Sequence, residues 1–220
     1  MLAQLVQGFH SLLFPAACAG CRLPLESGPL CAKCADGLPR PPFPGLPERG
    51  RPLDGACSPF LYQGVCRDLI LALKYEGRLS LIPFFASNME EEILRLLGKP
   101  PADRVLPVPL HSTRLRERTF NQAELLADAV ARRLGIPCET QILIRSRPTR
   151  PQAELTREER SRNVRGAFDL RRGSFLKGSR LLLVDDVLTT GATAGACALL
   201  LKKAGARSVW IVTAARQPIA

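Results

Sequence analysis

One segment restricts the fold of this chain more than any other: LLLVDDVLTTGAT, from Leu181 to Thr193. Its four leading apolar residues predict a strand that is buried on both faces, which is typical of a parallel sheet covered by helices. Asp185 and Asp186 follow directly, and a turn of small and hydroxyl residues then leads into a helical pattern. Because open parallel sheets bind ligands beside the carboxyl ends of their strands, the segment predicts an α/β fold and marks its site.

The turn after the two acids has the composition of a loop that binds a monophosphate. Backbone N–H groups, hydroxyl donors and the positive end of the following helix favour a phosphate there. Gly191 lets the backbone approach the phosphate closely. The candidate phosphate-binding residues are Thr189, Thr190, Gly191, Ala192 and Thr193.

The two acids suit the neighbouring part of the same ligand. Carboxylates accept hydrogen bonds from ribose hydroxyls and hold the water shell of Mg²⁺, a hard cation that prefers oxygen ligands. If Asp185 and Asp186 only capped a turn, the buried strand before them and the TTGAT turn after them would be coincidental. We therefore expect a ribose 5-phosphate along this loop, with the two acids as candidate catalytic residues.

The rest of the chain alternates between strand patterns and helix patterns. Expected strands lie at 104–110, 140–145, 166–170, 180–186 and 208–215, and expected helices at 66–78, 81–98, 120–135 and 193–206. This order predicts a mostly parallel sheet with helices on both faces. The highly charged stretch from 146 to 165 has no apolar period and is expected to form a long loop.

Composition divides the chain into three expected parts. Residues 1–38 combine a predicted amphipathic helix with a cysteine-rich segment, residues 39–56 form a linker rich in Pro and Gly, and residues 57–220 form the main domain. No apolar run approaches the roughly 20 residues that span a bilayer, and the N-terminus lacks the Lys or Arg of a signal peptide. We therefore expect a cytoplasmic protein with no membrane partner.

The cysteine-rich segment has the spacing of a structural zinc site. Its two CxxC pairs are separated by nine residues, as in zinc ribbons and knuckles. A disulfide scaffold is not expected in the cytoplasm, and free or redox-active thiols are the alternative. The candidate metal ligands are Cys18, Cys21, Cys31 and Cys34. The remaining cysteines are expected to behave as small apolar residues: Cys57, Cys66, Cys138 and Cys197.

The segment with the two acids resembles the phosphoribosyl-diphosphate signature of type I phosphoribosyltransferases. LKYEGR at 73–78, the stretch at 105–127 and RSRNVRGAF at 160–168 are similar to the ComF branch of that superfamily. The resemblance covers nearly the whole chain. It implies a type I phosphoribosyltransferase-like fold, with Asp185 and Asp186 at the ribose hydroxyls, Thr189 to Thr193 at the 5-phosphate, and phosphoribosyl diphosphate with Mg²⁺ as the ligand.

The resemblance also implies that the loop after the first core strand contacts pyrophosphate. Arg114, Arg116 and Arg118 lie there, and guanidinium groups match phosphate oxygens in a planar fork. Alternate spacing does not aim all three the same way, so we expect one or two at the ligand; an exposed basic loop is the alternative. Lys74 and Tyr75 allow a structural and a functional interpretation equally.

Two functions are compatible with these motifs. The first is transfer of a 5-phosphoribosyl group from phosphoribosyl diphosphate to an acceptor that the sequence does not identify. The second, implied by the ComF resemblance, is a non-catalytic accessory role in DNA uptake, through a helicase-like competence protein or single-stranded DNA. The net charge of +11 favours anionic partners. Since only 5% of residues are aromatic, no base-stacking surface is evident, and a protein partner is favoured.

Overall fold

The computed structural model describes residues 17–42, 45–46, 52–100, 102–149 and 156–218. The helix predicted near the N-terminus, within residues 1–13, and part of the charged stretch, 150–155, lie outside the described residues. In the described part of the chain, no helix is both long enough and apolar enough to cross a membrane.

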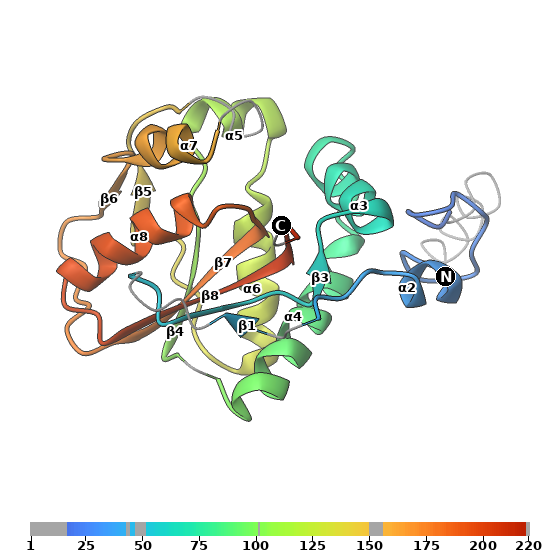
Figure 1. Ribbon diagram of the computed structural model, residues 1–220, viewed down its shortest axis with the longest axis horizontal. Helices are drawn as coiled ribbons and strands as arrows, with labels where there is room; N and C mark the ends of the chain where they lie inside the picture. The colour runs from blue at the N-terminus through green and yellow to red at the C-terminus, as the bar shows by residue number, and fades with distance from the viewer. Residues whose placement is uncertain (1–16, 43–44, 47–51, 101, 150–155, 219–220) are drawn as a thin grey trace, which may run out of the picture.

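A mostly parallel sheet forms the centre of the molecule, as predicted (Figure 1). Its strands are β1 (Gly45–Leu46), β2 (Gly55–Cys57), β3 (Phe60–Leu61), β4 (Arg104–Pro107), β7 (Arg180–Leu188) and β8 (Ser208–Arg216). They lie in the order β1-β2-β8-β7-β4, with β3 paired further along β8. Of these pairs, β1 with β2 alone is antiparallel. The edge of the sheet therefore reaches into residues 39–56, the stretch predicted as a linker.

Helices cover both faces of this sheet. α3 (Gly64–Tyr75), α4 (Leu81–Leu97) and α6 (Gln122–Leu134) lie on one face, and α8 (Ala192–Lys203) lies on the other (Figure 1). Strand β7 contributes to both cores, because neighbouring side chains on a strand point to opposite faces. Leu182 and Val184 pack with α3, α4 and α6, whereas Leu181 and Leu183 pack with α8. This two-sided burial is the physical reason for the continuous apolar run in the sequence.

Two of the expected strands form a sheet of their own. β5 (Leu143–Arg145) and β6 (Phe168–Leu170) pair antiparallel and pack on the α8 side of the molecule. Between them, part of the expected loop is a helix, α7 (Arg157–Val164). Thr156 and Glu159 form a capping box at its start. The prediction of a loop is therefore wrong for residues 157–164. The start of this helix is marked by a capping box and not by an apolar period, so periodicity does not reveal it.

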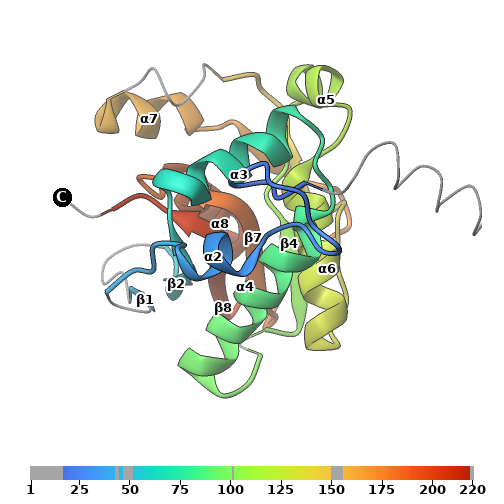
Figure 2. The same ribbon diagram turned by 90° about the vertical axis from the view of Figure 1, so that its right-hand side faces the viewer.

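The arginine cluster also lies on a helix and not on a loop. Residues Ser112–Arg118 form α5, which lies at the same end of the molecule as α7 (Figures 1 and 2). His111 caps its start, with Nδ1 accepting a hydrogen bond from the Thr113 N–H at 3.3 Å. None of the α5 residues is buried, so the helix leaves no apolar stripe in the sequence from which it could be predicted.

Both ends of α6 follow from its cap residues. The Asn121 side chain accepts a hydrogen bond from the Ala123 N–H at 3.1 Å, and its Nδ2 donates to the Val108 carbonyl at 3.3 Å. Gly135 ends the helix in the left-handed region, with φ at 67°, as predicted. The contact to Val108 holds the first turn of α6 against the end of β4. Gln122, the first residue of α6, is thereby placed beside the end of β7.

Candidate functional site

A cleft of about 480 Å³ opens at the carboxyl ends of β4 and β7, where the sequence predicts the site. Residues from α3, α5 and the first turn of α8 line it. The structure brings these predicted residues together in its lining: Arg114, Arg118, Asp185, Asp186, Thr189, Gly191, Ala192 and Thr193. Thr190 and Arg116 are not lining residues.

The spacing of the three arginines on α5 explains why two of them line the cleft and one does not. Residues four apart lie on the same face of a helix, so Arg114 and Arg118 both face the cleft. Arg116 lies between them, on a different face, and is exposed. Within the helix, Arg114 also forms an ion pair with Glu117 at 2.9 Å.

The two neighbouring acids have different environments because they project from opposite sides of β7. Asp186 is 5% exposed and projects toward α3 and α6. Its carboxylate forms an ion pair with Lys74 Nζ at 2.7 Å and accepts a hydrogen bond from Gln122 Nε2 at 2.5 Å. Asp185 is partly exposed and, among the described residues, forms no ion pair with a Lys or Arg. One of its oxygens accepts the Asp186 backbone N–H at 2.8 Å.

This arrangement shifts the pKa values of Lys74 and Asp185. Burial lowers the pKa of Lys74, but attraction to Asp186 outweighs it, so the pKa is raised and the side chain stays charged. Burial and repulsion from Asp186 raise the pKa of Asp185 to about 7, against opposing attraction from Lys74 and Arg145. Asp186 is therefore paired inside the protein, whereas Asp185 has a backbone hydrogen bond and a raised pKa, so it holds a proton more readily than an ordinary carboxyl group.

Several polar residues of the cleft were not singled out from the sequence, and Gln122 and Arg145 are two of them. Gln122 lies at the start of α6, and Arg145 lies at the end of β5, where its guanidinium packs over the Phe168 ring with 5.3 Å to the ring centroid. Burial lowers the pKa of Arg145. Gln122 lies within the stretch 105–127 that resembles the ComF branch, but no local pattern marks it or Arg145 as a cleft residue, because the fold brings both there from distant parts of the chain. Lys74, which the sequence left open, is the ion-pair partner of Asp186.

The predicted phosphate loop has the backbone geometry of an anion site. Gly191 is the N-cap of α8 with φ at 74°, a conformation that favours glycine. Because the N-cap residue is a glycine, it has no side chain of its own to donate to or accept from the helix end. The N–H groups in the first turn of a helix have no intrahelical partner, and here residues Gly191 to Ala194 line the cleft. The first turn of α8 can therefore donate to a phosphate.

The four cysteines of the N-terminal segment converge in space. Their sulfur atoms all lie within 4.8 Å of one another. Cys31 Sγ lies 3.7 Å from Cys18 Sγ and 3.8 Å from Cys21 Sγ. These separations fit a tetrahedral zinc ion, because Zn–S bonds of about 2.3 Å put the sulfurs about 3.8 Å apart. The helix α2 (Ala32–Asp36) follows Cys31 and carries Cys34.

The surroundings of these sulfurs also suit a bound cation. Burial raises the pKa of Cys18, but backbone N–H groups of Cys21, Cys31 and Gly20 donate to its sulfur and lower the pKa to about 6. Burial and the three neighbouring thiols raise the pKa of Cys34 to about 12. The raised pKa applies to Cys34, and a bound metal would compensate the charge that its deprotonation creates.

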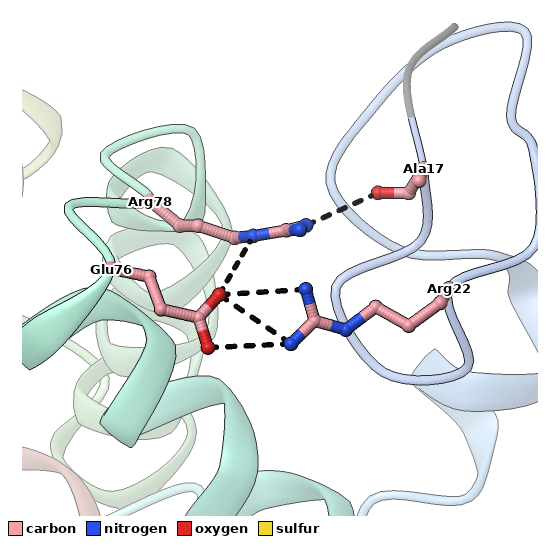
Figure 3. Close-up of polar contacts among 4 residues, drawn as sticks. All are labelled: Ala17, Arg22, Glu76 and Arg78. Carbon is pink, nitrogen blue, oxygen red and sulfur yellow. Dashed lines mark hydrogen bonds and ion pairs between the residues drawn. The ribbon is translucent and has the colours of Figure 1, made fainter.

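The cysteine segment is docked on the outer side of α3, the helix that carries Lys74 (Figure 2). Ala19 is buried in the same core cluster as Leu69 of α3. Just past the C-terminal end of α3, Arg22 forms an ion pair with Glu76 at 3.3 Å, and Arg78 donates to the Ala17 carbonyl at 3.4 Å (Figure 3). Exposed ion pairs contribute only about 0 to 1 kcal/mol, so the buried contacts hold the segment in place.

The other cysteines are separate from this cluster. Cys57, Cys66 and Cys197 are at most 2% exposed, and Cys138 is half-buried. Burial raises the pKa of Cys57 and of Cys66 to about 12. These thiols are protonated at neutral pH and pack as small apolar side chains.

Comparison with known proteins gives matches along most of the chain. The family model for the phosphoribosyl transferase domain matches residues 121–220. The DNA utilization protein YhgH of Salmonella typhi is 32% identical over 222 residues, which cover 91% of this chain and 96% of that protein. Competence protein F of Haemophilus influenzae is 36% identical over 116 residues, which cover 52% of this chain and 50% of that protein.

A solved structure is also similar to this chain. The glutamine phosphoribosylpyrophosphate amidotransferase of B. subtilis, complexed with ADP and GMP, has a TM-score of 0.44 and 22% sequence identity. The match covers 65% of this chain and 30% of that chain.

The raised pKa of Asp185 gives a prediction for stability. Between pH 4 and pH 7 the folded protein keeps a proton on Asp185 that the unfolded chain has released, so stability from this group falls as the pH rises through that range. In buffer without Mg²⁺, Asp185→Asn should stabilise the protein less at pH 5 than at pH 8. The gain over the wild type should grow by about 1 to 3 kcal/mol between these two pH values.

Chemical denaturation at both pH values measures this difference. Asp169→Asn, which removes an exposed carboxylate outside the cleft, is the matched control for the loss of one negative charge. An equal effect of Asp185→Asn at pH 5 and pH 8 would show that Asp185 titrates normally.

Proposed function

The chain belongs to the ComF family of type I phosphoribosyltransferase-like proteins, and on this basis we propose that its cleft binds phosphoribosyl diphosphate, or another 5-phosphorylated ribose, with Mg²⁺. One observation supports the proposal above the others. The carboxyl group of Asp185, which has no Lys or Arg ion-pair partner among the described residues, and the glycine-capped start of α8 lie in the same cleft. A carboxylate and a set of backbone N–H donors suit the hydroxyls and the phosphate of one ribose 5-phosphate.

In this proposal each part of the cleft meets one part of the ligand. The first turn of α8, from Gly191 onward, donates to the 5-phosphate. Asp185 accepts from the ribose hydroxyls, and Asp186 keeps the end of β7 in place through Lys74 and Gln122. Arg114 and Arg118 extend toward the diphosphate, whose oxygens their guanidinium groups match.

The reaction that fits this arrangement is transfer of the 5-phosphoribosyl group. The bond between ribose C1 and the diphosphate oxygen breaks, the acceptor forms a new bond to C1, and pyrophosphate leaves with both electrons of the broken bond. Mg²⁺, when bound, neutralises charge on the leaving diphosphate. The residues of the cleft contribute orientation and electrostatic stabilisation, with Lys74, Arg114 and Arg145 supplying positive charge.

A second candidate function is an accessory role in DNA uptake that uses the same pocket without turnover. The names of two relatives, competence protein F and DNA utilization protein YhgH, favour it. The net charge of +11 supports an anionic partner, and a helicase-like protein or single-stranded DNA would fit this role. A fold and a pocket do not establish turnover, so both functions are compatible with one binding site.

The N-terminal cysteines form part of the same proposal. We expect Cys18, Cys21, Cys31 and Cys34 to hold one structural Zn²⁺, because their sulfur separations fit a tetrahedron and because sulfur fills all four coordination positions. A reducing cytoplasmic location would keep these thiols available to the metal.

Pyrophosphate release separates the two functions. We expect the protein, supplied with phosphoribosyl diphosphate, Mg²⁺ and a panel of nitrogenous bases and amines, to release pyrophosphate with at least one acceptor. A coupled phosphate assay measures it. Ligand binding with no release for any acceptor would exclude transfer within that panel and favour the accessory function.

Replacement of Asp185 tests the ligand assignment. Asp185→Asn should keep the fold and weaken phosphoribosyl diphosphate with Mg²⁺ by about 10- to 100-fold, since hydrogen bonds to a charged group contribute about 1.5 to 3 kcal/mol. Titration calorimetry measures the dissociation constant. An unchanged constant in a folded Asp185→Asn protein would contradict the assignment.

Asp186 supplies the comparison for this experiment. Asp186→Asn leaves Lys74 buried without its partner and should lower the free energy of unfolding by about 3 kcal/mol. Adding Lys74→Met removes the unpaired charge and should restore most of that stability. The double variant thus separates loss of binding from loss of folding in Asp186→Asn. Asp185→Asn should show no loss of folding.

Metal analysis tests the zinc site. Protein purified without a histidine tag should contain about one zinc per chain, and Cys31→Ser should lower that content, because it removes one of four ligands. Cys138→Ser, outside the cluster, is the matched control. Less than about half an equivalent of zinc, with no change in Cys31→Ser, would exclude the site.

A further inference from the structure

Tyr75 is the exposed aromatic side chain of the cleft. It is 67% exposed, although large apolar and aromatic side chains are usually covered. It lies at the C-terminal end of α3, one residue after Lys74, which contacts Asp186 on the cleft floor. Tyr75 lines the same cleft as the two acids.

The ring is held in one orientation by α5. The Arg118 guanidinium lies over it, with 4.9 Å from Cζ to the ring centroid, and Arg118 Nη2 donates to the Tyr75 hydroxyl at 3.1 Å. These two contacts fix both the plane of the ring and its rotation. A side chain that is already ordered loses less entropy when a ligand binds against it. With the guanidinium on one face and 67% of the residue exposed, the ring offers a preorganised flat surface.

The charges of the cleft restrict what can bind beside this surface. Its cationic lining residues are Arg67, Lys74, Arg114, Arg118 and Arg145. Its acidic lining residues are Asp185 and Asp186, and Asp186 is already paired with Lys74. A neutral planar ring can bind beside these cations and stack on Tyr75, whereas an aliphatic amine has no ring face to stack.

From these observations we propose that Tyr75 is a stacking platform for a planar nitrogenous ring attached to C1 of the bound ribose. The inference rests on the proposed phosphoribosyl site and deepens it, because it assigns the acceptor to the class of aromatic heterocycles and not to amines. Arg118 is the positioning residue that orients the platform. Stacking of a base on an aromatic side chain tolerates different bases, so the platform sets the class of ring and not its identity.

Paired titrations with two ligands test the platform separately from the pocket. Ribose 5-phosphate reports on the phosphate loop and the acids, and AMP reports on the same contacts plus the ring. In the presence of Mg²⁺, Tyr75→Leu should raise the dissociation constant of AMP by about five- to 100-fold. The dissociation constant of ribose 5-phosphate should stay within about twofold of the wild-type value. Tyr75→Phe, which keeps the ring, should retain most of the AMP affinity.

Phe175→Leu is the matched control, because Phe175 is 72% exposed and lies outside the cleft lining. This variant should change the affinity for neither ligand, and thermal melts should show that all three variants are folded. If Tyr75→Leu weakens both ligands equally, or neither, while the wild type binds ribose 5-phosphate, the platform is excluded and the pocket stands. If the wild type binds neither ligand, the platform and the proposed function both fail.

Discussion

The buried contact of Asp186 with Lys74 and Gln122 is the interaction on which the site depends. It joins the end of β7 to α3 and to the first turn of α6, three elements that are distant in sequence. Removing both charges from water is costly, and the pair is tolerated because each group has its partner within hydrogen-bond distance. The contact fixes the floor of the cleft and sets α3 beside it, with the cysteine segment docked on the other side of that helix.

This contact also makes the two neighbouring acids unequal. Asp186 is compensated from inside the protein, so the demand for an external partner falls on Asp185, whose pKa is raised to about 7. A site that destabilises one carboxylate in the absence of ligand gains stability when a cation or a set of hydroxyls arrives. If Asp185 binds the ligand as proposed, stability and binding are in opposition at this residue, as is common at functional sites.

Much of the fold could be predicted from local patterns. The apolar run before Asp185 specified a strand buried on both faces, and the small turn around Gly191 was correctly placed before the helix α8. Helices without an apolar stripe, α5 and α7, were missed because caps and tertiary position, not periodicity, specify them. The partners of Asp186 could not be predicted, since no local pattern states that residues 74, 122 and 186 meet.

Binding of a phosphoribosyl group at one organised end of the sheet is the property from which both proposed functions follow. Calorimetric titration of the intact protein with phosphoribosyl diphosphate, at a series of Mg²⁺ concentrations, measures this property. We expect one site per chain, an affinity that rises with Mg²⁺, and no binding of ribose that lacks the 5-phosphate. Absence of binding at millimolar ligand, or equal binding of ribose without its phosphate, would show that the cleft is not a phosphoribosyl site.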